Sequence, residues 1–170
     1  MEFSELVKKR YSCKSYDGRP ISDDELAVIL EAGRQAPTAK NLQEQRIYVA
    51  RSEEALQKID ALTPCRFNAS TVLIVAFDTT RTFTYPGGQR DSGVEDASIV
   101  ATHMMLAAAS IGVDSCWVNL FDPAEAADLL GLPENEEVLM LLDLGYAAEG
   151  AGPLPNHGNR KPLTETVTYL

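Results

Sequence analysis

Apolar residues recur at helical spacing in several stretches of the chain. In one of them, "SDDELAVILEAG", Ser22 is followed three residues later by Glu25, the capping-box pattern that begins a helix. In another, "DPAEAADLLG", Asp122 is a suitable N-cap and Gly131 a suitable stop. The patterns predict helices around residues 3–7, 22–33, 52–62 and 122–131.

Other stretches have the composition of strands. Residues 71–77, "TVLIVAF", form a continuous apolar run, which is typical of a central strand buried on both faces. Residues 46–50 and 137–146 also predict strands, and residues 115–121 predict a strand or a tight loop. Residues 81–93 are rich in Gly, Pro and polar side chains and predict a loop. Helices and strands are intermixed, so the fold class is α/β or α+β, built in layers.

The longest apolar stretch runs from Ala97 to Val113 and holds no charge. It is shorter than the roughly 20 residues that cross a bilayer, and it contains polar residues, so we do not expect a membrane span. We expect a helix buried on nearly all sides, in the domain centre, in a subunit interface or in both. His103 on this helix has no partner ligand at helical spacing and is expected to be a core or interface residue rather than a metal ligand.

The stretch "KRYSCKSYDGRPIS" places Arg10, Ser12, Lys14 and Tyr16 at every second position. In an extended backbone these side chains line one side, which offers two cations, a hydroxyl and an aromatic ring to one neighbour. That pattern indicates a contact surface for an anion. The alternative is a solvated turn, since Lys and Arg are mostly exposed.

The last residues, 153–170, hold three prolines and no helical period, and they predict an extended arm over a surface. The closing "TVTYL" has strong strand propensity. We therefore expect this end to dock on a sheet, which could belong to a second subunit.

The composition narrows the function classes. The chain has 170 residues, enough for one domain over 1–170, and a net charge of -10, which argues against a nucleic-acid partner. Three widely spaced cysteines, Cys13, Cys65 and Cys116, fit neither a disulfide framework nor a zinc site, so a reducing cytoplasm is expected. The N-terminus has no apolar core of a secretory signal.

Motifs for several kinds of chemistry are absent from the sequence. It has no GxGxxG, no GxxxxGK[ST] and no GxSxG, and its two histidines give little material for a nucleophilic triad. A bound cofactor is then the natural source of chemistry, because the protein needs to supply only binding and electrostatics.

Five motifs, in register over most of the chain, resemble those of the nitroreductase family of flavin enzymes. "RYSCKSY" resembles the family's opening R-R-S-x-R-x-[FY] pattern, and "APTAKNLQEQRIYVA" its A-P-S-x-x-N-x-Q-P-W element. "GVEDASIVATHMMLAAASIGVDSCWV" looks like the family's central helix. "DLGYAAEG" looks like its last strand and turn, and "HGNRKPLTETV" like its C-terminal basic element.

The resemblance implies an α+β fold, a three-layer α/β sandwich with a central mixed sheet, in an intertwined homodimer that binds FMN at the subunit interface. It implies an enzyme that passes electrons from NADH or NADPH to nitroaromatics, quinones or related conjugated acceptors by a ping-pong mechanism. The same flavin contacts would also serve a non-enzymatic FMN-binding or electron-transfer flavoprotein, which stays open as the alternative.

The resemblance also implies roles for individual residues. Arg10 and Arg160 would hold the phosphate of FMN, Lys14 would lie by the N1 edge of the ring, and Asn119 would be near N5. Gly145 would lie in a turn beside the phosphate, and residues 37–41 would come from the other subunit. The full set of cofactor-binding residues implied is Arg10, Tyr11, Ser12, Lys14, Pro37, Thr38, Ala39, Asn41, Val118, Asn119, Gly145 and Arg160; no catalytic side chain and no metal are expected.

The chain departs from the family pattern at two places. Glu44 and Gln45 stand where the family has Pro-Trp, which removes a packing aromatic from that loop. Asn119 stands where the family often has a small residue, so it narrows the site or adds a hydrogen bond. No large insertion follows the long helix, which implies an open site that admits varied acceptors.

Overall fold

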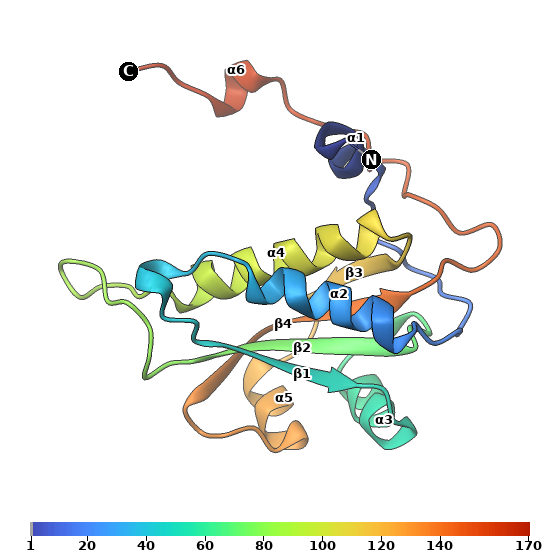
Figure 1. Ribbon diagram of the computed structural model, residues 1–170, viewed down its shortest axis with the longest axis horizontal. Helices are drawn as coiled ribbons and strands as arrows, with labels where there is room; N and C mark the ends of the chain where they lie inside the picture. Colours follow the sequence, from blue (N-terminus) through green and yellow to red (C-terminus); the bar gives the residue numbers. More distant parts are fainter. Residues whose placement is uncertain (1) are drawn as a thin grey trace.

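A four-stranded sheet forms the middle layer of the computed structural model, which describes residues 2–170 (Figure 1). The strand order is β1-β2-β4-β3, and every neighbouring pair is antiparallel. One parallel bridge, between Ser12 and Ser115, adds an extended segment beside β3 and makes the sheet mixed. The strands are β1 (Gln45–Ala50), β2 (Thr71–Asp78), β3 (Asp114–Val118) and β4 (Glu136–Gly145).

Helices α2 and α4 cover one face of the sheet, and α3 and α5 cover the other (Figure 1). This arrangement confirms the expected three-layer sandwich. The helices are α1 (Phe3–Lys9), α2 (Asp23–Arg34), α3 (Glu53–Leu62), α4 (Gly93–Ser110), α5 (Pro123–Leu130) and α6 (Leu163–Thr166), with 3-10 turns η1 (Ala39–Asn41) and η2 (Pro64–Arg66).

The helix starts read from the sequence are confirmed. The Ser22 hydroxyl accepts a hydrogen bond from the Glu25 amide at 3.2 Å. The Glu25 carboxylate accepts one from the Ser22 amide at 2.8 Å, which completes the capping box of α2. Asp122 caps α5, and Gly131 ends it in the left-handed conformation. These signals act over a few residues, so the fold does not change them.

Strand β2 is the centre of the core, and all eight of its residues are buried. Leu73 and Val75 pack toward α2 and α4, whereas Val72 and Ile74 pack toward α3 and α5. A strand that is covered on both faces needs no polar alternation, which explains its continuous apolar sequence.

The long helix is less buried within one chain than the sequence predicts. It begins at Gly93 and ends at Ser110, and Val100 and Met104 pack into the core. The opposite side leaves Val94 49% exposed and Ile99 37% exposed. The sheet covers only one side of the helix within the single chain, so burial of the other side requires a subunit interface, the second place expected for this helix.

The expected strand at the C-terminus is also not formed. Residues 163–166 make one turn of helix, α6, and Tyr169 is 95% exposed. The arm leaves the body of the protein (Figure 1), so no sheet edge within the chain is near enough to pair with its backbone. Among residues 2–170, none of the helices combines the length and apolarity needed to cross a membrane.

Candidate functional site

The cationic segment, residues 10–14, lies along β3. Ser12 forms the parallel bridge to Ser115, and the Cys13 amide donates to the Ser115 carbonyl at 2.9 Å. Cys13 is buried, whereas Arg10 and Ser12 are half-buried and Lys14 is exposed. The alternation expected of an extended segment therefore holds from Arg10 to Lys14, and it leaves three polar side chains accessible on one side.

Tyr16 does not continue this alternation, and the prediction that it shares the accessible side is wrong. It is 3% exposed and packs with Cys13 and Ala69 in a small core cluster. Its ring lies against Gly145, where an added Cβ would be 2.9 Å from a ring carbon. Gly145 is thus buried under Tyr16, and this contact gives a physical reason for a glycine there.

Two small cavities border the cationic segment. The first, of about 230 Å³, is lined by Arg10 and Tyr11 together with residues of the α4–β3 connection. The second, of about 150 Å³, lies between Ser12, Lys14 and the start of the arm. Each is smaller than the roughly 300 Å³ at which small-molecule pockets typically begin, so neither makes a complete site in one chain.

Arg10 differs from the other half-buried arginines in having no acidic partner among the described residues. The half-buried Arg46, Arg51 and Arg66 all pair with carboxylates. Within residues 2–170, Arg10 and Lys14 have neither an ion pair nor a side-chain hydrogen bond. In a protein with a net charge of -10, two neighbouring cations without carboxylate partners provide a place for an anion.

Tyr11 is a neutral hydrogen-bonding group at this site. Burial, and next the negative charge of Asp114, raise the pKa of the Tyr11 phenol well above its usual value. Its ring also meets His157 edge-on, with ring centroids 6.5 Å apart. This contact brings the start of the arm next to the cationic segment.

Arg160 lies on the same arm. Its guanidinium donates to the carbonyls of His157 and Asn159, and the side chain is exposed. These hydrogen bonds fold the arm into a local turn. Arg160 is three positions along the chain from His157, whose ring contacts Tyr11.

The predicted residues Val118 and Asn119 lie at the end of β3, the strand that holds the cationic segment. Val118 is buried, and the exposed Asn119 accepts a hydrogen bond from the Trp117 indole at 2.8 Å. Burial, followed by the charge of Asp143, raises the pKa of Cys116 to about 12, while Lys14 acts in the opposite direction. The thiol is therefore protonated and unreactive, as expected for a buried cysteine.

The other predicted residues, Pro37, Thr38, Ala39 and Asn41, lie together in a loop with an unusual backbone. Lys40, Asn41 and Gln43 have φ values of 52°, 57° and 53°. Such left-handed residues cost energy unless their surroundings hold them.

The loop and the cationic segment lie at opposite ends of α4. The Ala39 amide donates to Asp96 in the first turn of that helix, whereas Arg10 and Tyr11 border Ala109 at its last turn. An 18-residue helix is about 27 Å long at 1.5 Å per residue. The structure thus brings Arg10, Tyr11, Ser12 and Lys14 together at one end of α4 and leaves the four loop residues at its far end.

Three buried acids near these regions were not predicted from the sequence. Glu44 and Asp96 meet behind the loop, and Asp143 lies in β4 with no hydrogen-bond partner among the described residues for either oxygen. The Glu-Gln departure from Pro-Trp was the one local signal for Glu44. No local pattern distinguishes Asp96 or Asp143 from ordinary surface acids, because their burial results from packing.

Known proteins resemble this chain in sequence and in fold. The model of the nitroreductase family matches residues 7–68 and 60–146. A protein of Archaeoglobus fulgidus, provisionally named NADH dehydrogenase/NAD(P)H nitroreductase, is 34% identical over 152 residues, which are 85% of each chain. A nitroreductase family protein from Clostridium difficile is 35% identical, with a TM-score of 0.92 over 99% of this chain and 98% of that chain.

The fold is shared more widely than the sequence. A nitroreductase from Exiguobacterium sibiricum, solved in complex with FMN, is 23% identical and has a TM-score of 0.86 over 100% of this chain and 98% of that chain. The family match and the 34% identity extend over most of the chain and include both ends of α4. This protein therefore belongs to the nitroreductase family.

Proposed function

We propose that this protein is an FMN-dependent NAD(P)H oxidoreductase that works as a homodimer. The observation that carries the proposal is the pair of accessible cations without carboxylate partners, Arg10 and Lys14, on a segment held firmly against β3. The FMN complex of the relative from Exiguobacterium sibiricum, and the name of the protein from Archaeoglobus fulgidus, support the choice of cofactor and electron donor.

The donor set fits FMN. A guanidinium such as that of Arg10 offers forked donors to a phosphate dianion, and the Ser12 hydroxyl adds a neutral donor. We assign Arg160 to the same phosphate, since the arm touches Tyr11 beside this segment. Lys14 places a positive charge where negative charge develops on the reduced ring, and Asn119 and the backbone of Val118 border the same region.

When bound, FMN takes two electrons from NADH or NADPH and passes them, in ping-pong order, to a nitroaromatic, a quinone or a related conjugated acceptor. The side chains of the site bind and orient the reactants, and no acidic or basic side chain is required for catalysis. The small size of the two cavities indicates that a second copy of the chain must complete the site.

The homodimer is supported by the geometry of α4. A two-fold axis that crosses this helix places the N-terminal end of one copy beside the C-terminal end of the other. The 37–41 loop of the partner subunit then reaches the cationic segment, and the exposed Val94 and Ile99 are covered. The arm, with Leu163 76% exposed, would be covered by the same contact.

The domain organisation and location belong to the same proposal. The chain acts as one domain over 1–170, and residues 153–170 form an arm that reaches over the partner subunit. We place the protein in the cytoplasm because Cys13, Cys65 and Cys116 are free thiols in the structure and suit a reducing compartment.

The test begins with purification and a visible spectrum. We expect flavin bands, anaerobic bleaching by NADH or NADPH, and recovery of colour with a quinone or a nitroaromatic. A yellow protein that neither nucleotide bleaches would support the alternative, an electron-transfer or FMN-storing flavoprotein. A colourless protein that does not take up FMN would overturn the proposal, and a folded, FMN-loaded monomer of 18.5 kDa in light scattering would overturn the homodimer.

A further inference from the structure

Two buried carboxyl groups lie behind the loop of residues 37–43, which contains the predicted residues 37–41. Glu44 is 0% exposed and Asp96 is 5% exposed, and both meet at Ser92: its hydroxyl donates to the Glu44 carboxyl at 3.3 Å, and its carbonyl accepts the Asp96 amide at 2.8 Å. Glu44 Oε2 and Asp96 Oδ2 have no hydrogen-bond partner among the described residues. Two neighbouring buried carboxylates repel, whereas one proton between them satisfies both oxygens.

The surroundings decide which group holds the proton. Asp96 lies in the first turn of α4 and accepts the Ala39 amide at 3.0 Å. Glu44 accepts a hydrogen bond from the Ser92 hydroxyl at 3.3 Å. Burial, and next the hydrogen bond with Asp96, raise the pKa of Glu44. Glu44 is therefore the protonated member of the pair.

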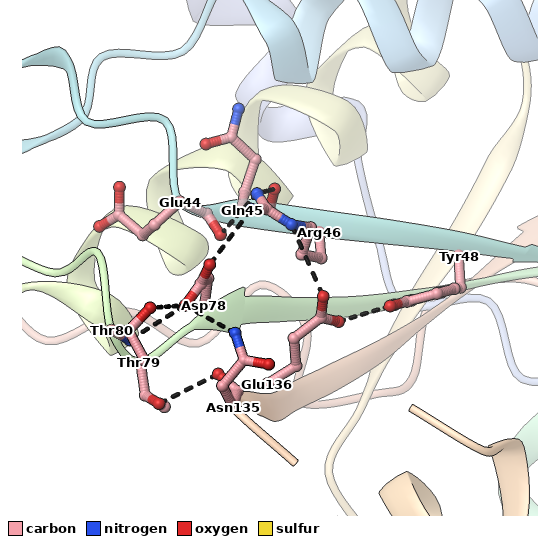
Figure 2. Close-up of polar contacts among 9 residues, drawn as sticks. All are labelled: Glu44, Gln45, Arg46, Tyr48, Asp78, Thr79, Thr80, Asn135 and Glu136. Carbon is pink, nitrogen blue, oxygen red and sulfur yellow. Dashed lines mark hydrogen bonds and ion pairs between the residues drawn. The ribbon is translucent and has the colours of Figure 1, made fainter. Parts of the chain in front are cut away.

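Among residues 2–170, no Lys or Arg forms an ion pair with Glu44 or Asp96. Arg46 donates to the backbone carbonyl of Glu44, but its ion pairs are with Asp78 and Glu136. Figure 2 shows this network beside β1 and β2, with the Glu44 carboxyl group turned away from it. Lys40, the nearest lysine in the sequence, lies over the Phe83 ring at 4.5 Å.

The pair holds two segments that have little other support. Local hydrogen bonds close the 37–43 loop on itself, such as that from the Gln43 amide to the Thr38 hydroxyl at 3.1 Å. Two side chains from distant parts of the chain also contact the loop: Asp96, which accepts the Ala39 amide, and Phe83, whose ring lies under Lys40. Ser92, bonded to Glu44, also accepts the amide of Phe83 in the loop that follows β2.

We propose that Glu44 and Asp96 form a proton-sharing pair that positions the 37–43 loop and makes this half of the site sensitive to pH. The proposal rests on the proposed function, in which that loop completes the FMN site of the partner subunit. Loss of the shared proton places two negative charges in a buried space, and the strained loop loses its anchor on α4. FMN affinity then falls as the pH rises.

Glu44→Gln is the test variant. Its amide donates to Asp96 and accepts from Ser92, so it reproduces the protonated state at every pH. Glu54→Gln is the matched control, because it makes the same chemical change at an exposed position of α3. Glu44 and Asp96 act through the loop, so they are positioning residues and not catalytic ones.

Two measurements across pH 5 to 9 test the pair. The first is the hydrogen-exchange protection factor of the Ala39 amide in the full-length protein, and the second is the dissociation constant of FMN. In the wild type and in Glu54→Gln, we expect protection to fall with rising pH and the dissociation constant to rise by up to about tenfold per pH unit above the pKa of Glu44. In Glu44→Gln, this extra pH dependence should be absent from both.

The outcomes separate the two proposals. Equal pH dependence in the wild type and in Glu44→Gln would overturn the role of the pair. If Ala39 protection behaves as expected but no variant binds FMN at any pH, the anchoring by the pair is supported and the proposed function fails.

Discussion

At the C-terminal end of α4, the cationic segment is held by backbone hydrogen bonds to β3, and its side chains are left accessible. At the N-terminal end, the 37–43 loop is held by the side chains of Thr38 and Asp96, and its backbone is strained. Side chains of the first region can therefore change without altering its position. The second region depends on side chains for its shape, so substitutions there change the geometry of the site.

The two ends of α4 also differ in the surroundings of the carboxyl groups buried there. Behind the loop, Glu44 lies beside a second acid, Asp96, and burial and this neighbour raise the pKa of Glu44. Behind the cationic segment, Asp143 has no hydrogen-bond partner among residues 2–170, and burial raises its pKa to about 8. A paired buried acid has a positioning role, whereas an unpaired one mainly affects stability.

The largest expected effect is on FMN binding, when subunits that are damaged at opposite ends of α4 are combined in one dimer. Arg10→Ala combined with Lys14→Ala damages one half of the site, and Asn41→Ile damages the other because a β-branched residue is strained at a positive φ. Each variant homodimer should lack FMN at a concentration that fills the wild type. A heterodimer of the two, isolated with two affinity tags, has one intact site and should bind about half the wild-type amount of FMN.

A heterodimer that binds no FMN would contradict the arrangement in which each site takes one half from each subunit. A wild-type dimer carrying the same two tags is the control and should be fully loaded.

The next effect concerns Asp143. Burial raises its pKa from 3.8 to about 8, so its contribution to stability is fully present below about pH 4 and is lost as the pH rises through about 8. The free energy of unfolding should fall by up to about 1.4 kcal/mol per pH unit within this window. Asp143→Asn should remove this slope in urea unfolding at pH 5 to 8, whereas the exposed Asp128→Asn should not. Parallel slopes in the wild type and in Asp143→Asn would mean that Asp143 titrates normally.

A smaller effect is expected from the phosphate contacts. Arg10→Ala and Arg160→Ala should each weaken FMN binding roughly ten- to hundredfold, since a hydrogen bond to a charged group contributes about 1.5–3 kcal/mol. Riboflavin, which lacks the phosphate, is the control ligand. Both variants should bind it as the wild type does and should lose the preference for FMN, as measured by fluorescence titration. An unchanged preference would place the phosphate elsewhere.

The smallest effect is expected at the ring. Lys14→Met removes a positive charge that stabilises the reduced ring more than the oxidised ring. The midpoint potential should fall by about 30 mV, which for a two-electron couple corresponds to about 1.4 kcal/mol. A redox titration measures this change, and Lys9→Met on α1 is the control. An unchanged or raised potential would place Lys14 away from the ring edge.

The sequence by itself determined the local features of this protein. The capping box at Ser22, the cap at Asp122 and the apolar run of β2 all appear where the patterns predict them. The alternation from Arg10 to Lys14 is also correct. These features depend on contacts within a few residues or on the burial of a whole strand, so they can be read without knowing the fold.

The tertiary structure decided the direction of Tyr16, the conformation of the arm and the relation between distant acids. Tyr16 turns inward because Gly145, 129 positions later, leaves room for its ring. The C-terminal residues form no strand because the arm runs away from the sheet and no sheet edge of the chain lies near it. Glu44 and Asp96 are 52 positions apart, and only the packing of the loop against the first turn of α4 brings them together. Burial and charge pairing depend on which segments the topology makes neighbours, and no local pattern encodes that.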